Sequence, residues 1–317
     1  MVFFTWHWSS LFYRLQNLVI FFSPKVITRI TGGLGNQLFV YAAARRLALV
    51  NNSELVLDDV SGFVRDYEYQ RHYQLDHFHI PCRKATLAER LEPFSKVRRY
   101  LKRRWNQRLP FEKRKYITRE SIDFEPRLLD LRSRGTIYLE GLWQSEGYFS
   151  DVDKVIRHDL RIQQPTDPMN LATADQIRKE IAIAVHVRFF DQGNADGINN
   201  APSDYYRRAV EIMGTSIPRA HYFLFSDQPL AARARLPLPD NRVTLIKHNQ
   251  GDESAYADLW LMSKCQHFII ANSTFSWWGA WLAKSEEKII IAPGFEKRDG
   301  CSYWGFDGLL PDSWIKV

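Results

Sequence analysis

The second half of the sequence alternates short apolar runs with helical segments, and this alternation restricts the possible folds more than any other feature. Five runs have the length of strands: "AIAVHVRFFD", "HYFLFSD", "VTLI", "HFIIANS" and "KIIIAP". Helices are predicted between them, over residues 204–213, 255–263 and 274–284. Strands that alternate with helices form a parallel sheet with helices on both faces. The second half is therefore predicted to be an α/β domain.

Polar residues follow three of these strands at the point where each strand ends. In parallel α/β sheets, ligands bind in the crevice at the carboxyl ends of the strands. We therefore expect three groups of residues to converge on one crevice: residues 186–188 (His-Val-Arg), 226–227 (Ser-Asp) and 272–274 (Asn-Ser-Thr).

The first half begins as a β-α-β unit. "KVITRI" is predicted to be a strand, a glycine turn follows it, a helix covers residues 37–49, and "SELVLDD" is a second strand. The pattern weakens from residue 62 to residue 120, and "GTIYLEGLWQ" returns as strand and loop. A break at "IQQPTDPMN", with two prolines, marks the domain boundary. We predict two α/β domains, residues 25–164 and 165–317.

The glycine turn, "TGGLGNQLF", is close to the fingerprint of a dinucleotide-binding fold. Gly33 and Gly35 suit backbone conformations that are closed to other residues. The N-terminus of the following helix suits a phosphate or a sugar hydroxyl. The fingerprint needs a third small residue, and Leu38 stands in its place. A tight turn without a ligand is the alternative, but the amides of Asn36 and Gln37 favour a ligand.

The motif "VHVRFFD" places a cation at the end of a buried strand. His186 and Arg188 alternate with valines, so they share one face of the strand. An arginine presents a fixed fork of donors that matches phosphate oxygens. Such an arginine can neutralise a departing diphosphate without a metal ion. An ion pair with a carboxylate such as Asp191 is an equally good interpretation.

The motif "FIIANSTFSWWGAWLAKS" combines a polar helix start with an aromatic stripe. Ser273 or Thr274 can cap the helix, and Ser276 adds a hydroxyl to a second candidate anion site. The tryptophans at positions 277, 278 and 281 fall on one face of the helix. Because apolar stripes of helical period usually pack inward, we interpret them as core and not as a platform for a sugar.

Cysteines and acidic pairs give no sign of a disulfide framework or a metal centre. The chain has three cysteines, an odd number without paired spacing, so a reducing, cytoplasmic setting fits. Asp151 and Asp153 have a spacing that can ligate a divalent cation. Here they precede a predicted helix, and an N-cap with a first-turn acid is the favoured role. No metal or cofactor is predicted.

The basic charge belongs to one segment. The chain carries a net charge of +7, whereas residues 83–119 contain 14 Lys or Arg against 3 acids. Such a run is either a solvated helical face or a contact surface for an anionic membrane or an acidic glycan. No recognition motif for nucleic acid accompanies it. Residues 1–24 are aromatic and apolar but interrupted by polar residues, so they are either an interfacial anchor or an extension without a folding role.

Three blocks together resemble the bacterial α-1,2-fucosyltransferases of glycosyltransferase family eleven. The blocks are "RITGGLGNQLFVYAAARRLA", "HVRFFD" and "NSTFSWWGAWLA", with "FLFSD" between the last two. The resemblance implies a GT-B-like fold, in which two Rossmann-like domains face each other across a cleft. It implies GDP-fucose as the donor, inversion at the anomeric carbon and no metal. The acceptor would be a terminal galactose or similar sugar in a growing glycan or on a lipid-linked oligosaccharide, at the inner membrane.

The resemblance also assigns roles to residues of this chain. It implies that Arg188 faces the donor diphosphate, that His186 lies near the nucleoside, and that Asp227 hydrogen-bonds guanine or ribose. Asp191 is the candidate general base. The remaining predicted site residues line the diphosphate or close over it from the other domain: Gly33, Gly35, Asn36, Gln37, Ser273, Thr274 and Ser276.

One departure from the family's pattern keeps rival functions open. The family often has two adjacent arginines, and here Phe189 holds the second place. The chain would then rely on Arg188 alone or recruit another cation. The rivals are a GT-B enzyme that uses another nucleotide sugar, a catalytically silent glycan-binding protein, and a dinucleotide oxidoreductase. The last would use Asp58, at the end of the second strand, to bind a ribose.

Overall fold

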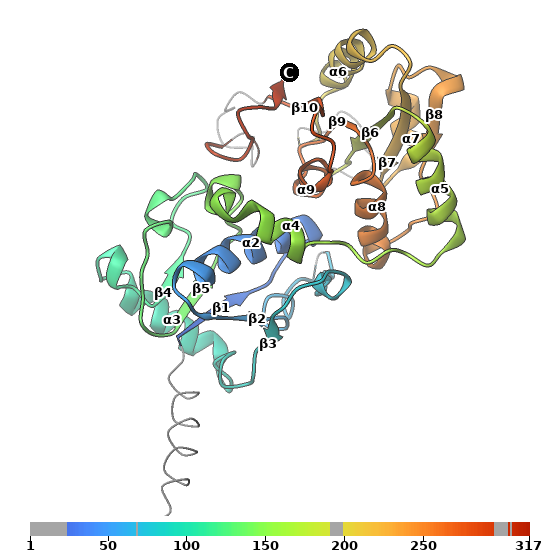
Figure 1. Cartoon of the computed structure of the whole chain (residues 1–317). Helices are drawn as coiled ribbons and strands as arrows, with labels where there is room; N and C mark the ends of the chain where they lie inside the picture. Colours follow the sequence, from blue (N-terminus) through green and yellow to red (C-terminus); the bar gives the residue numbers. More distant parts are fainter. Residues whose placement is uncertain (1–23, 68, 191–198, 295–303, 305) are drawn as a thin grey trace, which may run out of the picture.

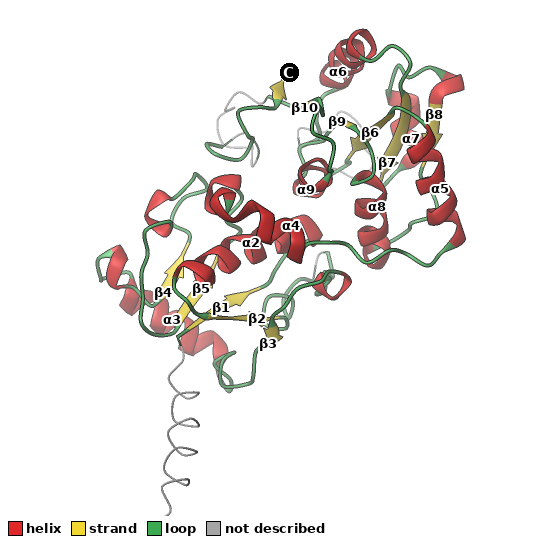
Figure 2. Ribbon diagram, viewed as in Figure 1, coloured by secondary structure: helices red, strands yellow, loops and turns green. Residues whose placement is uncertain are grey.

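The chain folds into two α/β domains that contact each other (Figures 1 and 2). The computed structural model describes residues 24–67, 69–190, 199–294, 304 and 306–317. Each domain has a parallel sheet with helices on its faces. The GT-B-like class that the sequence predicts is thereby confirmed. The predicted N-terminal extension lies, up to residue 23, outside the described residues.

The N-terminal sheet has the strand order β3-β2-β1-β5-β4, and its neighbouring strands pair in parallel. The helices of this domain are α2 (Leu34–Val50), α3 (Ser95–Asn106) and α4 (Asp153–Asp159). Its strands are β1 (Lys25–Arg29), β2 (Glu54–Asp58), β3 (Arg83–Lys84), β4 (Tyr116–Thr118) and β5 (Ile137–Glu140).

The two faces of the N-terminal sheet are covered in different ways. Alternate strand residues such as Val26 and Leu55 pack in the main apolar core with α2. The opposite face has a small apolar cluster around Ile27 and Val56. Beside this cluster, α3 is held by charge: Arg99 donates to Asp58 (2.5 Å) and to Glu140 (2.8 Å), both buried. A carboxylate buried with its cation is strongly favoured over one left alone, so these pairs anchor α3.

The C-terminal sheet has the strand order β11-β10-β9-β6-β7-β8, again with parallel neighbours. Its strands are β6 (Ala182–Val187), β7 (His221–Ser226), β8 (Val243–Leu245), β9 (His267–Ile269), β10 (Ile290–Ala292) and β11 (Ile315–Lys316). Its helices are α5 (Pro168–Lys179), α6 (Ser203–Ser216), α7 (Pro229–Arg235), α8 (Ala255–Met262) and α9 (Thr274–Leu282).

Helix α5 begins inside the stretch that the sequence analysis treats as a break. Asp167 caps it by accepting the backbone N–H groups of Met169 and Asn170, and Pro168 holds the first helical position. A capping acid followed by proline is typical of a helix start. The sequence analysis treated the two prolines only as a break and missed this start. Just before this helix, the N–H of Gln163 still donates to the carbonyl of His77 in the N-terminal domain.

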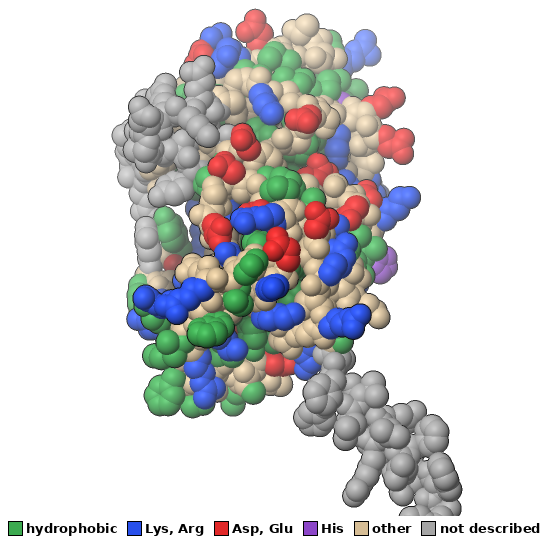
Figure 3. Space-filling view, turned by 90° about the vertical axis from the view of Figure 1, so that its left-hand side faces the viewer, with side chains coloured by type: hydrophobic (Ala, Val, Ile, Leu, Met, Phe, Trp, Pro, Cys, Tyr) green, Lys and Arg blue, Asp and Glu red, His purple; other side chains and the backbone are tan. Residues whose placement is uncertain are grey.

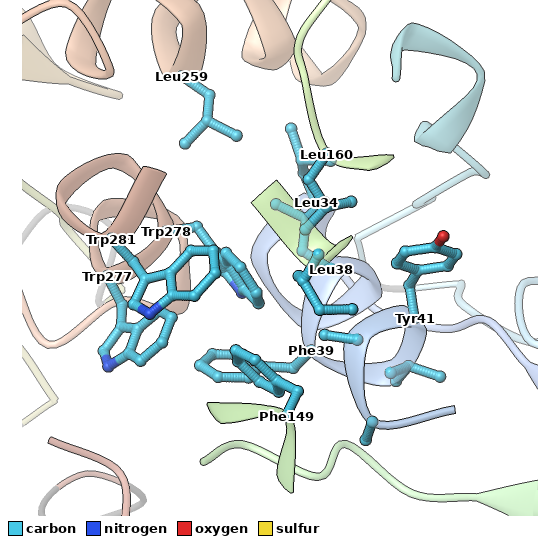
Figure 4. Packing of buried hydrophobic residues seen from close by; sticks show 14 of the residues in the cluster. Leu34, Leu38, Phe39, Tyr41, Phe149, Leu160, Leu259, Trp277, Trp278 and Trp281 are labelled. Atoms are coloured by element: carbon cyan, nitrogen blue, oxygen red, sulfur yellow. The ribbon is translucent and has the colours of Figure 1, made fainter. Parts of the chain in front are cut away.

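The two domains share an apolar core at the junction of α2 and α9. Phe39 of α2 lies 4.6 Å from Trp277 and 5.0 Å from Trp278, measured between ring centroids. Phe149 stacks on Trp278 and meets the edge of Trp281 (Figure 4). All five side chains are buried, so the interpretation of the tryptophans as core is confirmed. These aromatic side chains form an apolar interface between the two domains. An apolar interface of this kind restrains the motion of one domain relative to the other.

The C-terminal segment crosses back to the N-terminal domain. The carbonyl of Asp307 accepts the backbone N–H of Phe124 (3.2 Å), and the guanidinium of Arg119 lies 5.2 Å from the ring of Phe306. The indole of Trp277 donates to the carbonyl of Leu309 (2.9 Å). Residues 306–309 therefore contact the domain that begins the chain, before β11 completes the second sheet.

None of the helices in the described part of the chain is long and apolar enough to cross a membrane.

Candidate active site

The glycine turn lies directly against the start of α9. A Cβ atom added at Gly35 would come within 2.5 Å of the backbone nitrogen of Phe275 and the carbonyl carbon of Thr274. Only glycine leaves room for this approach. The positive φ of the turn, +76°, belongs to Gly32, whereas Gly33 has a φ of −68°. The predicted need for an unusual backbone conformation at Gly33 is therefore wrong, and the reason for glycine at position 35 is close packing.

Asn36 connects the turn to the other domain. Its side-chain oxygen accepts a hydrogen bond from the hydroxyl of Thr274 (3.2 Å) and another from the amide of Gln144 (2.8 Å). Gln144 belongs to the segment after β5, at the same sheet edge as the turn. The first and third predicted motifs, far apart in the sequence, thus meet at one point.

Gln37 supports the turn from inside. Its side chain is fully buried, and its amide nitrogen donates to the carbonyls of Gly32 and His72. Its oxygen accepts the backbone N–H of Gln74. The amide thereby fixes both the turn and the loop beside it. The predicted contact of Gln37 with a ligand stays a prediction, and the geometry gives this amide a structural role.

Arg188 emerges at the carboxyl edge of the second sheet. It follows β6, and its guanidinium pairs with the carboxylate of Asp227 at 3.2 Å. Asp227 follows the neighbouring strand β7 and also accepts the backbone N–H of Phe189. Parallel strands β6 and β7 end in register, so they bring both residues to one edge. Asp191, which the sequence analysis considers as a partner of Arg188 and as a base, lies outside the described residues.

His186 is a buried neutral base next to this edge. Its ring is 5.6 Å from that of Phe275 in α9, between centroids. Its Nδ1 atom has no hydrogen-bond partner among the described residues. Burial, and secondarily the charge of Arg188, lower the pKa of His186 to about 3. The imidazole is therefore uncharged near pH 7 and can offer a hydrogen bond but no positive charge.

The shifted pKa predicts a pH effect on stability. Between pH 6.5 and pH 3, His186 is protonated in the unfolded chain but stays neutral in the folded chain. The free energy of unfolding therefore decreases as the pH falls through this range. Between pH 7 and pH 5 this loss is about 2 kcal/mol. We expect His186→Gln to lack this contribution, and urea denaturation of both proteins at the two pH values measures it.

Only the difference between the two proteins isolates His186. Burial raises the pKa of Asp258 to about 7, so this carboxyl titrates in the same range with the opposite sign. Its contribution is common to both proteins and cancels. Equal pH dependence of the variant and the unmodified chain would contradict the neutral, buried state of His186.

The start of α9 is a capped helix end. Ser273 caps it by accepting the backbone N–H of Phe275 (3.3 Å), as predicted, while Ser276 is buried and donates to the carbonyl of Ser273. The side-chain oxygen of Asn272 is buried and has no partner among the described residues. A helix N-terminus with hydroxyls and a spare polar atom suits an anion.

Phe189 stands at the second arginine of the family's pattern, and Arg71 is the cation that lies beside the glycine turn. Phe189 is 4% exposed and packs in the apolar core under α6. A cation is available from the other domain, because the guanidinium of Arg71 would lie 3.7 Å from a Cβ added at Gly33. Arg71 also pairs with Asp252 of the C-terminal domain. The irregular segment that contains Arg71 gave no signal in the sequence.

The acidic residues that the sequence analysis considered as ligands, in residues 151–153 and at Asp58, have structural roles. Asp151 pairs with Arg46 at 2.7 Å, and Asp153 begins α4 as a first-turn acid. The predicted first-turn acid is therefore confirmed at Asp153, whereas the predicted acidic N-cap is wrong, because Val152 occupies that position without a side-chain bond. Within the residues that the structure describes, no group of three or more His, Cys, Asp or Glu side chains is placed to hold a metal ion. Asp58 is buried against Arg99, which leaves it unsuited to a ribose.

Comparisons with known proteins agree with these motifs. The profile of "Glycosyl transferase family 11" matches residues 25–299. The "Alpha-1,2-colitosyltransferase" of Escherichia coli is 28% identical over 305 residues, which cover 92% of this chain and 98% of that protein. The "O-antigen biosynthesis glycosyltransferase WbnK" of the same organism is 28% identical over 313 residues, covering 91% and 99%.

Among solved structures, the fucosyltransferase NodZ from Bradyrhizobium matches at 16% identity and a TM-score of 0.47, over 82% of this chain and 94% of that one. The family profile spans both domains, from β1 to beyond β10. This chain therefore belongs to glycosyltransferase family 11.

Proposed function

We propose that this family 11 enzyme transfers L-fucose from GDP-fucose to a hydroxyl of a terminal galactose or similar sugar, at O2, with inversion. The product would belong to a bacterial O-antigen or another surface glycan. The observation that carries the proposal is the contact between the glycine turn and the start of α9, at Asn36 and Thr274, beside the strand edge that holds Arg188. The names of the two Escherichia coli relatives support both an α-1,2 linkage and a role in O-antigen synthesis.

The donor diphosphate is proposed to lie between Arg188 and the start of α9. The guanidinium is half-exposed, with 29% of its side chain accessible, so it can contact a ligand while Asp227 holds it. The N–H groups and hydroxyls at the helix start add a second positive end. Together they would neutralise a leaving GDP without a metal ion.

In the proposed reaction, the bond between C1 of fucose and the β-phosphate oxygen breaks, and its electron pair leaves with GDP. The acceptor hydroxyl attacks C1 from the opposite face, so the β-linked donor gives an α-linked product. The hydroxyl proton passes to a base within hydrogen-bond reach. Asp191 remains the proposed base. The turn at Gly33 and Asn36 would close over the diphosphate or the sugar from the N-terminal domain.

The direct test is transfer by the purified full-length protein. With GDP-fucose, a terminal β-galactoside and EDTA, we expect an α-1,2-fucosylated product identified by linkage analysis. GDP at 100 times its dissociation constant should stabilise the fold by about 2.7 kcal/mol, and UDP should do so far less. Absence of transfer to several galactosides, with no stabilisation by GDP, would contradict the proposal.

A second donor is worth testing because one relative is named for colitose, a 3-deoxy counterpart of fucose. A site that hydrogen-bonds the 3-hydroxyl group would favour fucose by a factor on the order of 10⁴ in kcat/KM. Comparable rates with both GDP-linked sugars would show a site without that contact.

Two other outcomes would support rival functions. Stabilisation of the fold by NADH, measured by thermal unfolding, would support the oxidoreductase alternative. Binding of a glycan without turnover would support a silent binding protein.

A further inference from the structure

Helix α3 presents its apolar side chains and most of its charged ones to solvent, and Arg99 is the charged side chain that it buries against the protein. At about 100° per residue, Val97, Tyr100, Leu101 and Trp105 share one face. Arg99 and Asn106 lie on the opposite face and are the only residues of the helix, all of which the structure describes, that are buried. The exposed fractions are 55% for Val97, 56% for Tyr100, 58% for Leu101 and 65% for Trp105. An exposed apolar patch of this kind marks a contact surface.

Unpaired cations surround this patch. The helix contains six Lys or Arg and no acid. Arg99 and Arg103 pair with Glu140. The other four, Lys96, Arg98, Lys102 and Arg104, form no ion pair with a described carboxylate. Lys102 Nζ lies 5.4 Å from the ring of Tyr138, and Arg104 donates a hydrogen bond to the hydroxyl of Tyr100. Figure 3 shows Lys and Arg side chains interleaved with hydrophobic ones over the lower part of the molecule, which is the N-terminal domain.

We propose that this α3 face (Phe94, Val97, Tyr100, Leu101, Trp105 and the four cations) docks the enzyme on a bilayer that contains anionic lipids. Aromatic and apolar side chains flanked by lysine and arginine match the boundary between headgroups and acyl chains. Each cation near an anionic surface strengthens binding by roughly fivefold. A protein partner with an acidic, apolar groove would share part of this chemistry. The aromatic side chains project from an exposed helix, however, and this arrangement favours a lipid bilayer as the partner.

The start of the described chain lies near helix α3. Lys25, two residues into the described part, pairs with Glu89 at 2.9 Å. The neighbouring carbonyl, of Arg90, accepts a hydrogen bond from Arg99 of α3. The described chain therefore begins near the Arg99 side of α3, and residues 1–23, whose sequence is rich in aromatic and apolar residues, precede it.

The test is co-sedimentation of the full-length chain with vesicles of phosphatidylcholine alone or of phosphatidylcholine mixed with the anionic lipid phosphatidylglycerol. We expect binding only to the anionic vesicles, weakened by added salt. Charge reversal of Lys96, Arg98, Lys102 and Arg104 to Glu should weaken binding by at least about 100-fold. Leu101→Ser with Trp105→Ser should weaken it by about tenfold.

Two matched controls use the C-terminal domain. Met169 and Leu230 are single exposed apolar residues there, and changing both to Ser should leave vesicle binding unaltered. The double variant Arg178→Glu and Lys179→Glu changes two exposed residues of α5 and should also leave vesicle binding unaltered. A chain that lacks residues 1–24 should keep binding that still depends on the α3 face.

Three outcomes would overturn the inference: no binding by the unmodified chain, unchanged binding by the α3 variants, or binding lost only when residues 1–24 are removed. A shift from dimer to monomer in the α3 variants, without vesicle binding, would identify a second copy of the chain as the occupant. Transfer to a water-soluble galactoside should be normal in every α3 variant. The docking surface and the proposed function can therefore fail separately.

Discussion

Replacing Arg188 with alanine should lower the turnover of GDP-fucose by roughly 100- to 1000-fold, the usual effect of removing a charge-stabilising donor. The guanidinium stands at the end of β6, where Asp227 holds it at 3.2 Å. In the proposed ground-state complex, solvent and the start of α9 also contact the diphosphate. In the transition state its leaving oxygen gains charge, so the loss should fall mainly on kcat. Steady-state kinetics with a soluble galactoside measure this split.

Two further variants make the result specific. Arg188→Lys keeps the charge but loses the planar fork, so its activity should lie between those of the alanine variant and the unmodified enzyme. Arg178→Ala removes an exposed arginine of α5 that pairs with Asp175, and activity should stay unchanged. Near-normal turnover in Arg188→Ala, or an equal loss in Arg178→Ala, would remove Arg188 from the mechanism.

The parallel strands were predictable because burial on both faces leaves a simple trace in the sequence. Residues 182–187 are all buried, and the matching run "AIAVHV" is apolar apart from its histidine. The same simplicity allowed the convergence of β6 and β7 to be predicted, since parallel strands end at one edge. The sequence analysis did not anticipate the ion pair of Arg188 with Asp227, and the pairing that it considered, with Asp191, lies outside the described residues. Asp191 is near Arg188 in the sequence, whereas Asp227 is near it through strand register.

The inverted polarity of α3 could not be read from periodicity. An apolar stripe normally marks the face that packs inward. Here the sheet face beneath the helix carries Asp58 and Glu140, so the inward residue is Arg99. The run of charge was correctly predicted to contain a helix, and its face is solvated except at Arg99, while the predicted contact with an anionic surface stays a prediction. One arginine is structural, and the solvent face combines the remaining charge with exposed rings.

The neutral state of His186 also depends on tertiary packing, which the sequence does not show. A histidine at the end of an apolar strand is visible in the sequence, but its desolvation comes from α9, whose Phe275 packs beside it. Arg71 is a similar case. It approaches the glycine turn from a segment without a regular pattern, and its carboxylate partner, Asp252, is 181 positions away.

Gly35→Ala should destabilise the protein by about 3 kcal/mol, at the upper end of the usual cost of overpacking. The added Cβ would meet backbone atoms of Thr274 and Phe275 at 2.5 Å, and backbone cannot rotate away as a side chain can. Helices α2 and α9 would have to separate. That movement would strain the contacts of Phe39 with Trp277 and Trp278, which form the apolar core between the domains. Urea denaturation measures the free energy of unfolding.

Two other glycines provide controls. A Cβ at Gly135 would meet no described atom within 4 Å, so Gly135→Ala should leave stability within the usual range of a surface change, about ±0.5 kcal/mol. Gly33→Ala places its methyl group at ordinary contact distance from Arg71 and should be tolerated better than Gly35→Ala.

Activity gives a second readout of the same contact. Separation of the helices would pull Asn36 away from the hydroxyl of Thr274, now 3.2 Å apart, and would open the site from the N-terminal side. Asn36→Ala removes the hydrogen bond without forcing the helices apart. If the turn closes over the donor, both variants lose turnover and only Gly35→Ala loses stability as well. A Gly35→Ala protein as stable and active as the unmodified chain would show that the domains do not meet at this glycine.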